Sequence, residues 1–186
     1  MSLHELPERL PVPEDDGAAD HLTGLSLPPL RLPATVGATV DLAQASAELL
    51  VLYVYPMTGT PGQAIPEGWD DIPGARGCTP QGCAFRDALT EFERHGAAVV
   101  GLSAQPHAEQ RDFAAREQIP FPLLADPGLE LARELRLPTF EAHGRTVYRR
   151  LTLIAQRGRI VKVFYPVFPP DRNATEVLAW LAANPH

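Results

Sequence analysis

The chain has two cysteines in its 186 residues, and they lie five positions apart in the segment GCTPQGCAFRD, residues 77–87. The segment predicts the start of a helix, because Thr79 can cap it and Pro80 suits its first position. A cysteine in the first turn of a helix faces unpaired backbone N–H groups and the positive end of the helix dipole, which favour the thiolate. Because the thiolate is the reactive form, the pattern predicts that Cys78 is an activated nucleophile.

Cys83 lies about one and a half turns further along the predicted helix, where ideal geometry puts the two Cα atoms about 8 to 9 Å apart. A disulfide requires about 4.4 to 6.8 Å. A bond between the pair therefore requires the first turn to unwind. Gly82 and Pro80 weaken that turn, since a glycine inside a helix costs about 1 kcal/mol relative to alanine. We expect reversible local unfolding rather than a permanent cross-link.

Two other interpretations of the cysteines stay open. Free cysteines are often simply buried as small apolar residues. A metal site would need ligands besides the two sulfurs, and the histidines show no ligand spacing, so no metal and no cofactor is expected. The histidines are residues 4, 21, 95, 107, 143 and 186.

The apolar run at 48–56 predicts a central strand that is buried on both faces and ends at Pro56. A loop rich in glycine and proline follows, and then a helix from about Thr79 to Arg94. Downstream, strands are expected at 97–104, 121–126 and in a hairpin over 146–166, and helices at 107–118, 127–136 and 171–183, the last capped by Asp171.

Alternating strands and helices predict an α/β, thioredoxin-like three-layer sandwich, with a mixed central sheet and helices on both faces. A β-hairpin is expected around Gly37, near the N-terminus of this domain. Residues 1–24 are rich in proline and acidic residues and predict an irregular arm, so the thioredoxin-like domain is expected over 25–186. Reactive sites in such sheets lie beyond the carboxyl ends of the strands, where the loop and both cysteines follow.

The net charge of −7 and the sequence pI of about 5.3 argue against nucleic acid or an anionic membrane as a partner. No apolar run approaches the roughly 18 residues of a membrane span, and the N-terminus lacks the apolar core of a secretory signal. We therefore expect a cytoplasmic protein. In that compartment two close cysteines are more often catalytic, redox-active or metal-binding than structural.

Four segments resemble those of the peroxiredoxins, specifically the PrxQ or bacterioferritin-comigratory group. They are GCTPQGCAFRD, VYPMTGTPG, PFPLLAD and RRLTLIAQRGRIVKVF, and the resemblance spans about residues 25–183. It implies that Cys78 is the peroxidatic cysteine and becomes a sulfenic acid. Cys83 would be the resolving cysteine that closes an intramolecular disulfide, which thioredoxin or a similar dithiol then reduces. The implied activity is that of a monomeric, thioredoxin-dependent reductase of hydrogen peroxide and organic hydroperoxides.

The family also places an arginine near the thiolate, where its charge stabilises the anion and attracts the peroxide oxygens. Alignment of the RRLTLI segment puts Arg149 at that position, with Arg150 as the alternative. Adjacent residues of a strand point to opposite faces, so one of the two is expected at the site, and the alignment favours Arg149.

The chain departs from the family's P-x-x-x-T-x-x-C motif. Pro56 and Thr60 fit, but Gln63 stands where the cysteine belongs, and Cys78 follows after the insertion 63–77. We expect the insertion to bulge out, so that Pro56 shields the thiolate and the Thr60 hydroxyl donates to the peroxide. The alternative is that both are ordinary turn residues.

The insertion carries Trp69 and Ile72, whose role the sequence leaves open: a cover for the pocket, a surface for a reductant or packing in a surface groove. Two further functions stay open as well. A thiol–disulfide oxidoreductase is disfavoured because its C-x-x-C spacing is absent. A non-enzymatic redox sensor would pass its disulfide to a partner through the inserted loop.

Overall fold

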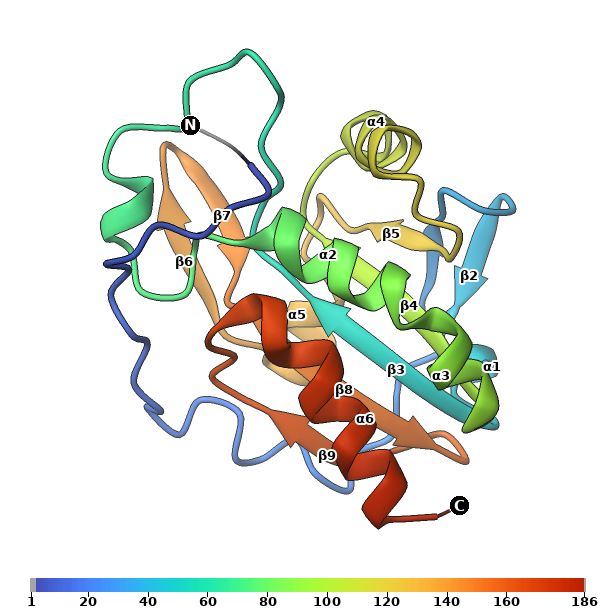
Figure 1. Ribbon diagram of the computed structural model, residues 1–186. Helices are drawn as coiled ribbons and strands as arrows, with labels where there is room; N and C mark the ends of the chain where they lie inside the picture. The colour runs from blue at the N-terminus through green and yellow to red at the C-terminus, as the bar shows by residue number, and fades with distance from the viewer. Residues whose placement is uncertain (1–2, 186) are drawn as a thin grey trace.

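The computed structural model describes residues 3–185, which form a five-stranded mixed sheet with helices on both faces (Figure 1). Strand β3 is parallel to β4, which is parallel to β5, while β8 and β9 continue the sheet antiparallel on the other side of β3. The α/β, thioredoxin-like class predicted from the sequence is confirmed. In sheet order the strands are β5 (Leu123–Ala125), β4 (Ala97–Ser103), β3 (Leu49–Val54), β8 (Leu151–Gln156) and β9 (Arg159–Phe164).

Strand β3 is buried on both faces, as its continuous apolar sequence predicts. Leu50 and Leu52 point into one core, and Val51 and Tyr53 point into the other. Burial of each such side chain stabilises the fold by about 1.5 to 3 kcal/mol. The strand is therefore a rigid base for the loop that leaves its carboxyl end.

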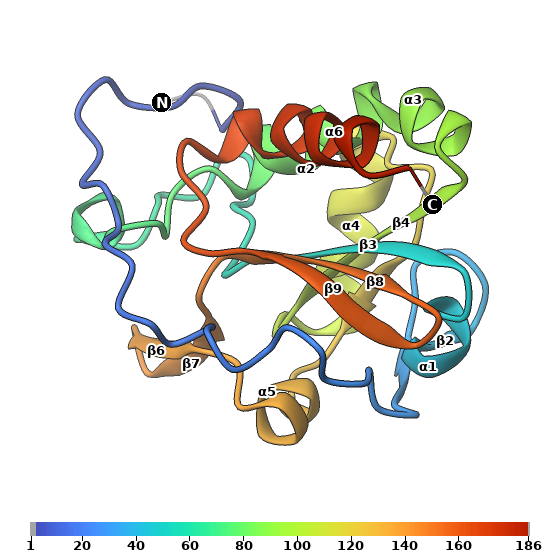
Figure 2. The same cartoon turned by 90° about the horizontal axis from the view of Figure 1, so that it is seen from below.

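Two layers of helices enclose the sheet (Figure 2). The Tyr53 face packs against α2 (Cys78–Asp87), α3 (Leu89–Arg94), α4 (His107–Glu117) and α6 (Asn173–Ala183). The opposite face packs against α5 (Glu130–Leu135) and the short α1 (Leu42–Ala45). Both cysteines lie on α2, in the first of these layers.

The expected hairpin around Gly37 is present as β1 (Arg31–Pro33) and β2 (Thr39–Asp41). A second hairpin, β6 (Thr139–Ala142) and β7 (Arg145–Tyr148), was not expected. Its two-residue turn, His143–Gly144, has positive φ at both positions, which suits the twist of a hairpin. The predicted strand beginning at 146 is thus two strands, and they are separated at Arg149 and Arg150.

The predicted helix Thr79–Arg94 is divided at Ala88 into α2 and α3, and its N-cap is Gly77 rather than Thr79. Gly77 has φ of +103°, and a Cβ at this position would lie 2.3 Å from Pro170 Cγ. Only glycine fits there. Asp171 does not cap the last helix, because it lies in the 3₁₀ turn η2 (Pro170–Arg172) that precedes α6.

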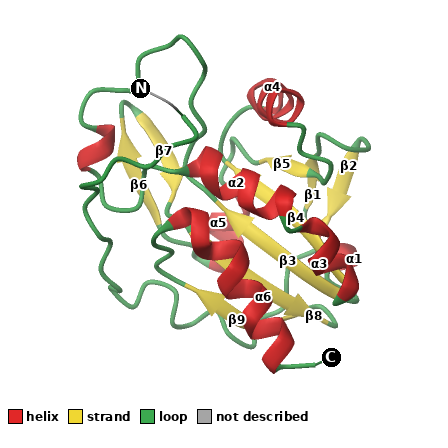
Figure 3. Cartoon of the chain, in the orientation of Figure 1, coloured by secondary structure: helices red, strands yellow, loops and turns green. Residues whose placement is uncertain are grey.

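Residues 3–24 contain no helix or strand and run along one side of the molecule (Figure 3). Ala19 and Leu22 are nevertheless buried in the core on the α5 face. The boundary between arm and domain at residue 24 stays a prediction. Within 3–185, no helix is long and apolar enough to cross a membrane.

Candidate active site

Cys78 occupies the first turn of α2, beside a cavity at the carboxyl end of β3. The side chain is 4% exposed, and both cysteines are free thiols. Its sulfur lies 3.2 Å from Arg150 Nη2 and 3.7 Å from the Ala75 carbonyl oxygen. The guanidinium donates to the sulfur, so a fixed positive charge lies beside Cys78.

Arg150, and not Arg149, is the arginine at the sulfur, which corrects the prediction from alignment. The Arg149 guanidinium lies 5.8 Å from the centre of the Phe140 ring, on the side of the arm. Both arginines lie between β7 and β8, and of the two only Arg150 contacts the Cys78 sulfur in the described part of the chain. One arginine of the pair reaches the sulfur, and it is the alternative to the residue that the alignment favoured.

Arg150 also fixes the end of the insertion. It is 3% exposed and donates to the carbonyl oxygens of Gly74, Ala75 and Arg76 at 3.1 to 3.2 Å. Its Nη1 donates to Gln81 on α2. The arginine thus joins the returning chain, the helix and the cysteine, and the insertion re-enters the site at residue 77 as the hypothesis required.

Two buried residues with amide side chains, Gln81 and Asn173, extend the hydrogen-bond network of Arg150. Sequence reasoning missed both. Gln81 Nε2 donates to Asn173 Oδ1 at 3.0 Å, and Thr152 Oγ1 donates to the same oxygen at 2.7 Å. The side chains of Gln81, Thr152, Asn173 and Arg150 are all 3% exposed or less. Neither amide stands in a motif, and their pairing becomes visible only when α2, β8 and α6 are packed together.

The cavity beside Cys78 has a volume of about 430 Å³. Thr60 lies in its wall and is exposed to solvent. Pro56 is buried outside the wall formed by the described residues, with its carbonyl oxygen accepting from Ser103 Oγ at 3.0 Å. Thr58, which sequence reasoning missed, also lines the cavity, but its hydroxyl already donates to Gln105 at 3.1 Å. Of the two expected residues, the structure brings Thr60 to the cavity and leaves Pro56 behind it.

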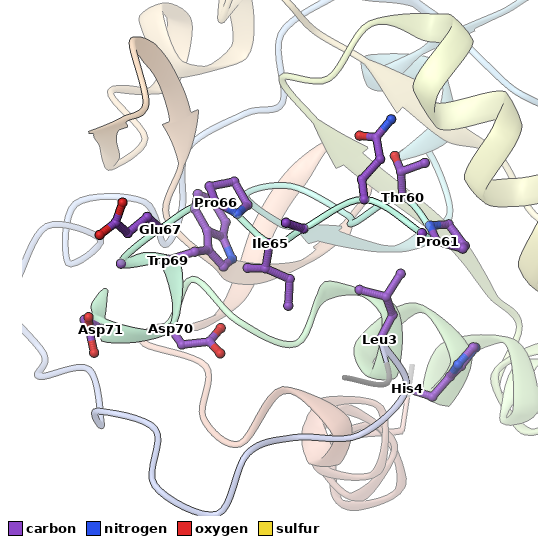
Figure 4. Close-up of a pocket in the computed structure, with 14 residues that line it drawn as sticks. Leu3, His4, Thr60, Pro61, Ile65, Pro66, Glu67, Trp69, Asp70 and Asp71 are labelled. Atoms are coloured by element: carbon purple, nitrogen blue, oxygen red, sulfur yellow. The ribbon is translucent and has the colours of Figure 1, made fainter.

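The insertion builds the outer side of the site. Trp69, in the 3₁₀ turn η1 (Trp69–Asp71), is 4% exposed and packs 6.0 Å from Phe140 of the β6–β7 hairpin. An adjoining cavity of about 640 Å³ lies under the insertion, where Leu3 of the arm faces Ile65 (Figure 4). The two cavities share Leu3, Thr60, Gln63, Ala64, Ile65, Pro66 and Trp69.

The electrostatic environment of Cys83 is the opposite of that of Cys78, because the charged group in contact with its thiol is a carboxylate. Its thiol is about half buried and donates to Glu117 Oε2 at 3.6 Å. Burial raises the pKa of Cys83 to about 11, the Glu117 carboxylate adds to this rise, and Arg86 opposes it. Cys83 is therefore protonated near neutral pH, while Cys78 faces a guanidinium. The two sulfurs therefore differ in the charge beside them, a guanidinium at Cys78 and a carboxylate at Cys83.

Glu117 is 5% exposed and is a further polar residue near the cysteines that sequence reasoning missed. Burial favours its protonated form, but hydrogen bonds from His4 and Arg116 hold the pKa of the carboxyl below its ordinary value. His4 Nε2 lies 2.7 Å from Oε2, and Arg116 Nε lies 3.1 Å from Oε1. His4, Cys83 and Glu117 form a group of metal-ligating type in the described part of the chain.

Tyr53 lies beneath α2, with its ring stacked 4.4 Å from that of Phe85. Its hydroxyl is buried and has no hydrogen-bond partner within residues 3–185. Burial also raises the pKa of Tyr53 well above its ordinary value, so the hydroxyl stays protonated. An unsatisfied buried hydroxyl costs the folded state about 1 to 3 kcal/mol.

Residues 22–178 match the model of the Redoxin family. The chain is 30% identical to the chloroplastic peroxiredoxin Q of Sedum lineare over 85% of this chain and 76% of that protein. It is also 30% identical to the protein of the same name from Triticum aestivum, over 82% of this chain and 64% of that one. Among solved structures, BcpB of Mycobacterium tuberculosis matches with a TM-score of 0.71 and 27% identity, over 88% and 99% of the two chains.

The chain belongs to the peroxiredoxin Q group of the Redoxin family. Peroxiredoxin Q of Xanthomonas campestris has a TM-score of 0.67 and 25% identity, and the match covers 96% of this chain and 97% of that one. The family membership predicted from the cysteine segment is confirmed. It supports a thiol peroxidase function for the chain.

Proposed function

We propose that this peroxiredoxin reduces hydroperoxides through a sulfenic acid on Cys78, which Cys83 resolves as an intramolecular disulfide. The observation that carries the proposal is the 3.2 Å contact between Arg150 Nη2 and Cys78 Sγ at the wall of a cavity. The guanidinium stabilises the attacking thiolate and, after attack, the developing charge on the oxygens.

In the first step the Cys78 thiolate attacks the terminal oxygen of R–O–O–H. The O–O bond breaks, the sulfur keeps the OH as sulfenic acid, and the alkoxide takes a proton and leaves as ROH. The first turn of α2 then unwinds and Cys83 attacks the sulfenic sulfur. The S–S bond forms, the S–OH bond breaks, and the thiol proton leaves with hydroxide as water. A dithiol such as thioredoxin reduces the bridge.

The apolar side chains beside Cys78 support alkyl hydroperoxides as substrates in addition to hydrogen peroxide. Leu3, Ile65 and Trp69 line the same cavity of about 430 Å³ as Cys78. A solved relative from Xanthomonas campestris, 25% identical, is described with alkyl peroxide reduction activity. Thr60 is proposed as a hydrogen-bond donor to the bound peroxide, and Pro56 as part of the packing that supports the loop rather than as a direct shield.

A monomeric, cytoplasmic enzyme remains the prediction from the sequence, and the curated relatives are named chloroplastic. The alternative functions also remain distinguishable. An oxidoreductase of protein disulfides would use the same two sulfurs without peroxide, and a redox sensor would react with peroxide without turning over.

The experiment is stopped-flow tryptophan fluorescence of the reduced protein mixed with hydrogen peroxide or cumene hydroperoxide, followed by turnover with thioredoxin, its reductase and NADPH. Fast oxidation with turnover is the expected result. Oxidation by disulfide donors alone would favour the oxidoreductase, and fast oxidation without turnover with any dithiol would favour the sensor. A Trp180→Phe variant leaves Trp69, nine positions before Cys78, as the reporter.

A further inference from the structure

We propose that the reduced protein binds one zinc-type divalent cation between His4, Cys83 and Glu117. The three donor atoms come from the arm, α2 and α4, and all lie within 4.8 Å of one another. Glu117 Oε2 is at the centre of the group, 2.7 Å from His4 Nε2 and 3.6 Å from Cys83 Sγ.

The donor set is the one that zinc prefers. Thiolate sulfur, imidazole nitrogen and carboxylate oxygen bind Zn²⁺ at about 2.3, 2.0 and 2.0–2.2 Å, which in a tetrahedron separates the donors by about 3.3 to 3.6 Å. The Cys83–Glu117 separation already meets this value, and the His4–Glu117 pair must widen by a fraction of an ångström. Three protein ligands leave the fourth position for water, as in an open site.

The surroundings hold two of the ligands in place. Arg116 binds Oε1 of Glu117 at 3.1 Å, which leaves Oε2 directed at the other two donors. Arg86 of α2 donates to the Glu117 carbonyl oxygen at 2.6 Å and so joins α2 to the end of α4. The His4 side chain is 59% exposed, so a hydrated cation reaches the site from solvent.

The charges also balance. A Cys83 thiolate and the Glu117 carboxylate together neutralise a divalent cation, while His4 binds as the neutral imidazole. Binding forms the metal–sulfur bond and releases the thiol proton to water. Arg86 and Arg116 are engaged in hydrogen bonds of their own, to Asp87 and to Oε1 of Glu117.

The site exists only while Cys83 is reduced, because a sulfur in a disulfide has no thiolate to offer. A bound cation also fixes Cys83 in the folded α2 and clamps the arm onto it. If the proposed function holds, on which this consequence rests, zinc leaves oxidation of Cys78 intact and blocks the closing of the disulfide. The protein would then accumulate as the sulfenic acid.

The test is titration of the reduced protein with Co²⁺ under anaerobic conditions, without peroxide, so that its outcome is independent of the peroxidase activity. We expect one equivalent to bind with the near-ultraviolet band of a thiolate–cobalt bond and the visible bands of a tetrahedral ion, both displaced by Zn²⁺. Cys83→Ser should lose the thiolate band. His4→Ala and Glu117→Gln should weaken binding at least tenfold, whereas Cys78→Ser should bind like the wild type.

Absence of the thiolate band from the wild type would overturn the proposal. So would its persistence at full affinity in His4→Ala, or its loss in Cys78→Ser, which would indicate a site made by the two cysteines alone. His95→Ala, at the exposed end of α3, is the matched control for removal of a histidine. Because His4 lies on an exposed part of the arm, its variant keeps the test valid if Glu117→Gln does not fold.

Discussion

The Arg150 guanidinium lies 3.2 Å from the sulfur of Cys78, although the two residues are 72 positions apart in the chain. The contact depends on the β7–β8 junction, on the returning insertion and on the first turn of α2, which Arg150 joins through hydrogen bonds. One side chain therefore couples the geometry of the cysteine to that of the loop that covers it.

Replacement of Arg150 by methionine is expected to slow oxidation of Cys78 by peroxide about 10- to 100-fold, since a hydrogen bond to a charged group contributes about 1.5 to 3 kcal/mol. The measurement is the second-order rate constant by stopped flow. Arg149→Met is the matched control and should change the rate by less than about twofold, because its guanidinium lies over Phe140. Equal losses in the two variants would contradict the assignment of Arg150.

Cys83 is expected to react slowly with iodoacetamide near neutral pH and faster as the pH rises toward 11. Burial raises the pKa of this thiol to about 11 from an ordinary value of 9.0, so the folded state favours the protonated form. That contribution to stability is present below pH 9 and is lost as the pH rises through about 11. The measurement is alkylation of the Cys78→Ser variant with a chelator present.

In the same assay, Glu117→Gln should move the alkylation profile of Cys83 to lower pH, because the carboxylate adds to the rise in the pKa of this thiol. An unchanged profile would mean that the carboxylate does not act on the thiol.

Tyr53→Phe is expected to stabilise the folded form of α2 and to slow formation of the disulfide. The substitution removes a buried hydroxyl without a described partner and keeps the ring that stacks on Phe85. Relief of about 1 to 3 kcal/mol would raise the melting temperature and, because unwinding of α2 exposes this hydroxyl to water, would slow closure about 5- to 100-fold. Rapid-quench mass spectrometry gives the closing rate, and Tyr55→Phe, whose hydroxyl donates to Gln110 at 2.6 Å, is the control. An increased rate in Tyr53→Phe would refute this role.

Thr60→Val is expected to slow oxidation of Cys78 about fivefold, the loss of one neutral hydrogen bond of about 1 kcal/mol to the peroxide. Thr58→Val provides a comparison on the same cavity wall, since the Thr58 hydroxyl already donates to Gln105 and is not free for substrate. An unchanged rate in Thr60→Val would remove Thr60 from the site and leave it as a turn residue.

The cysteine segment and the alternation of strands and helices predicted the family and the fold, because both are local patterns. The position of Cys78 at the start of α2 follows from the same segment, although the cap is Gly77 and not Thr79. The β6–β7 hairpin was missed because the continuous β-type sequence around Tyr148 hides the end of a strand. At Arg149 and Arg150 the alignment selected the residue that does not contact Cys78.

Residues joined only by the tertiary fold could not be found from the sequence. Glu117 and His4 are separated by 113 positions, and neither belongs to a motif. A donor atom of each nevertheless lies within 4.8 Å of the Cys83 sulfur. Buried polar groups such as Gln81 and Asn173 give no periodic signal, because their partners lie on other elements. The packing of α2 against α4, α6 and the arm decides these contacts.

The central claim is tested most directly by peptide mapping of the protein after one equivalent of peroxide, in the wild type and in Cys83→Ser. We predict a peptide with Cys78 joined to Cys83 in the wild type and a sulfenic acid on Cys78, trapped by dimedone, in the variant. A wild-type protein that never joins the two cysteines, or a variant oxidised elsewhere than at Cys78, would contradict it.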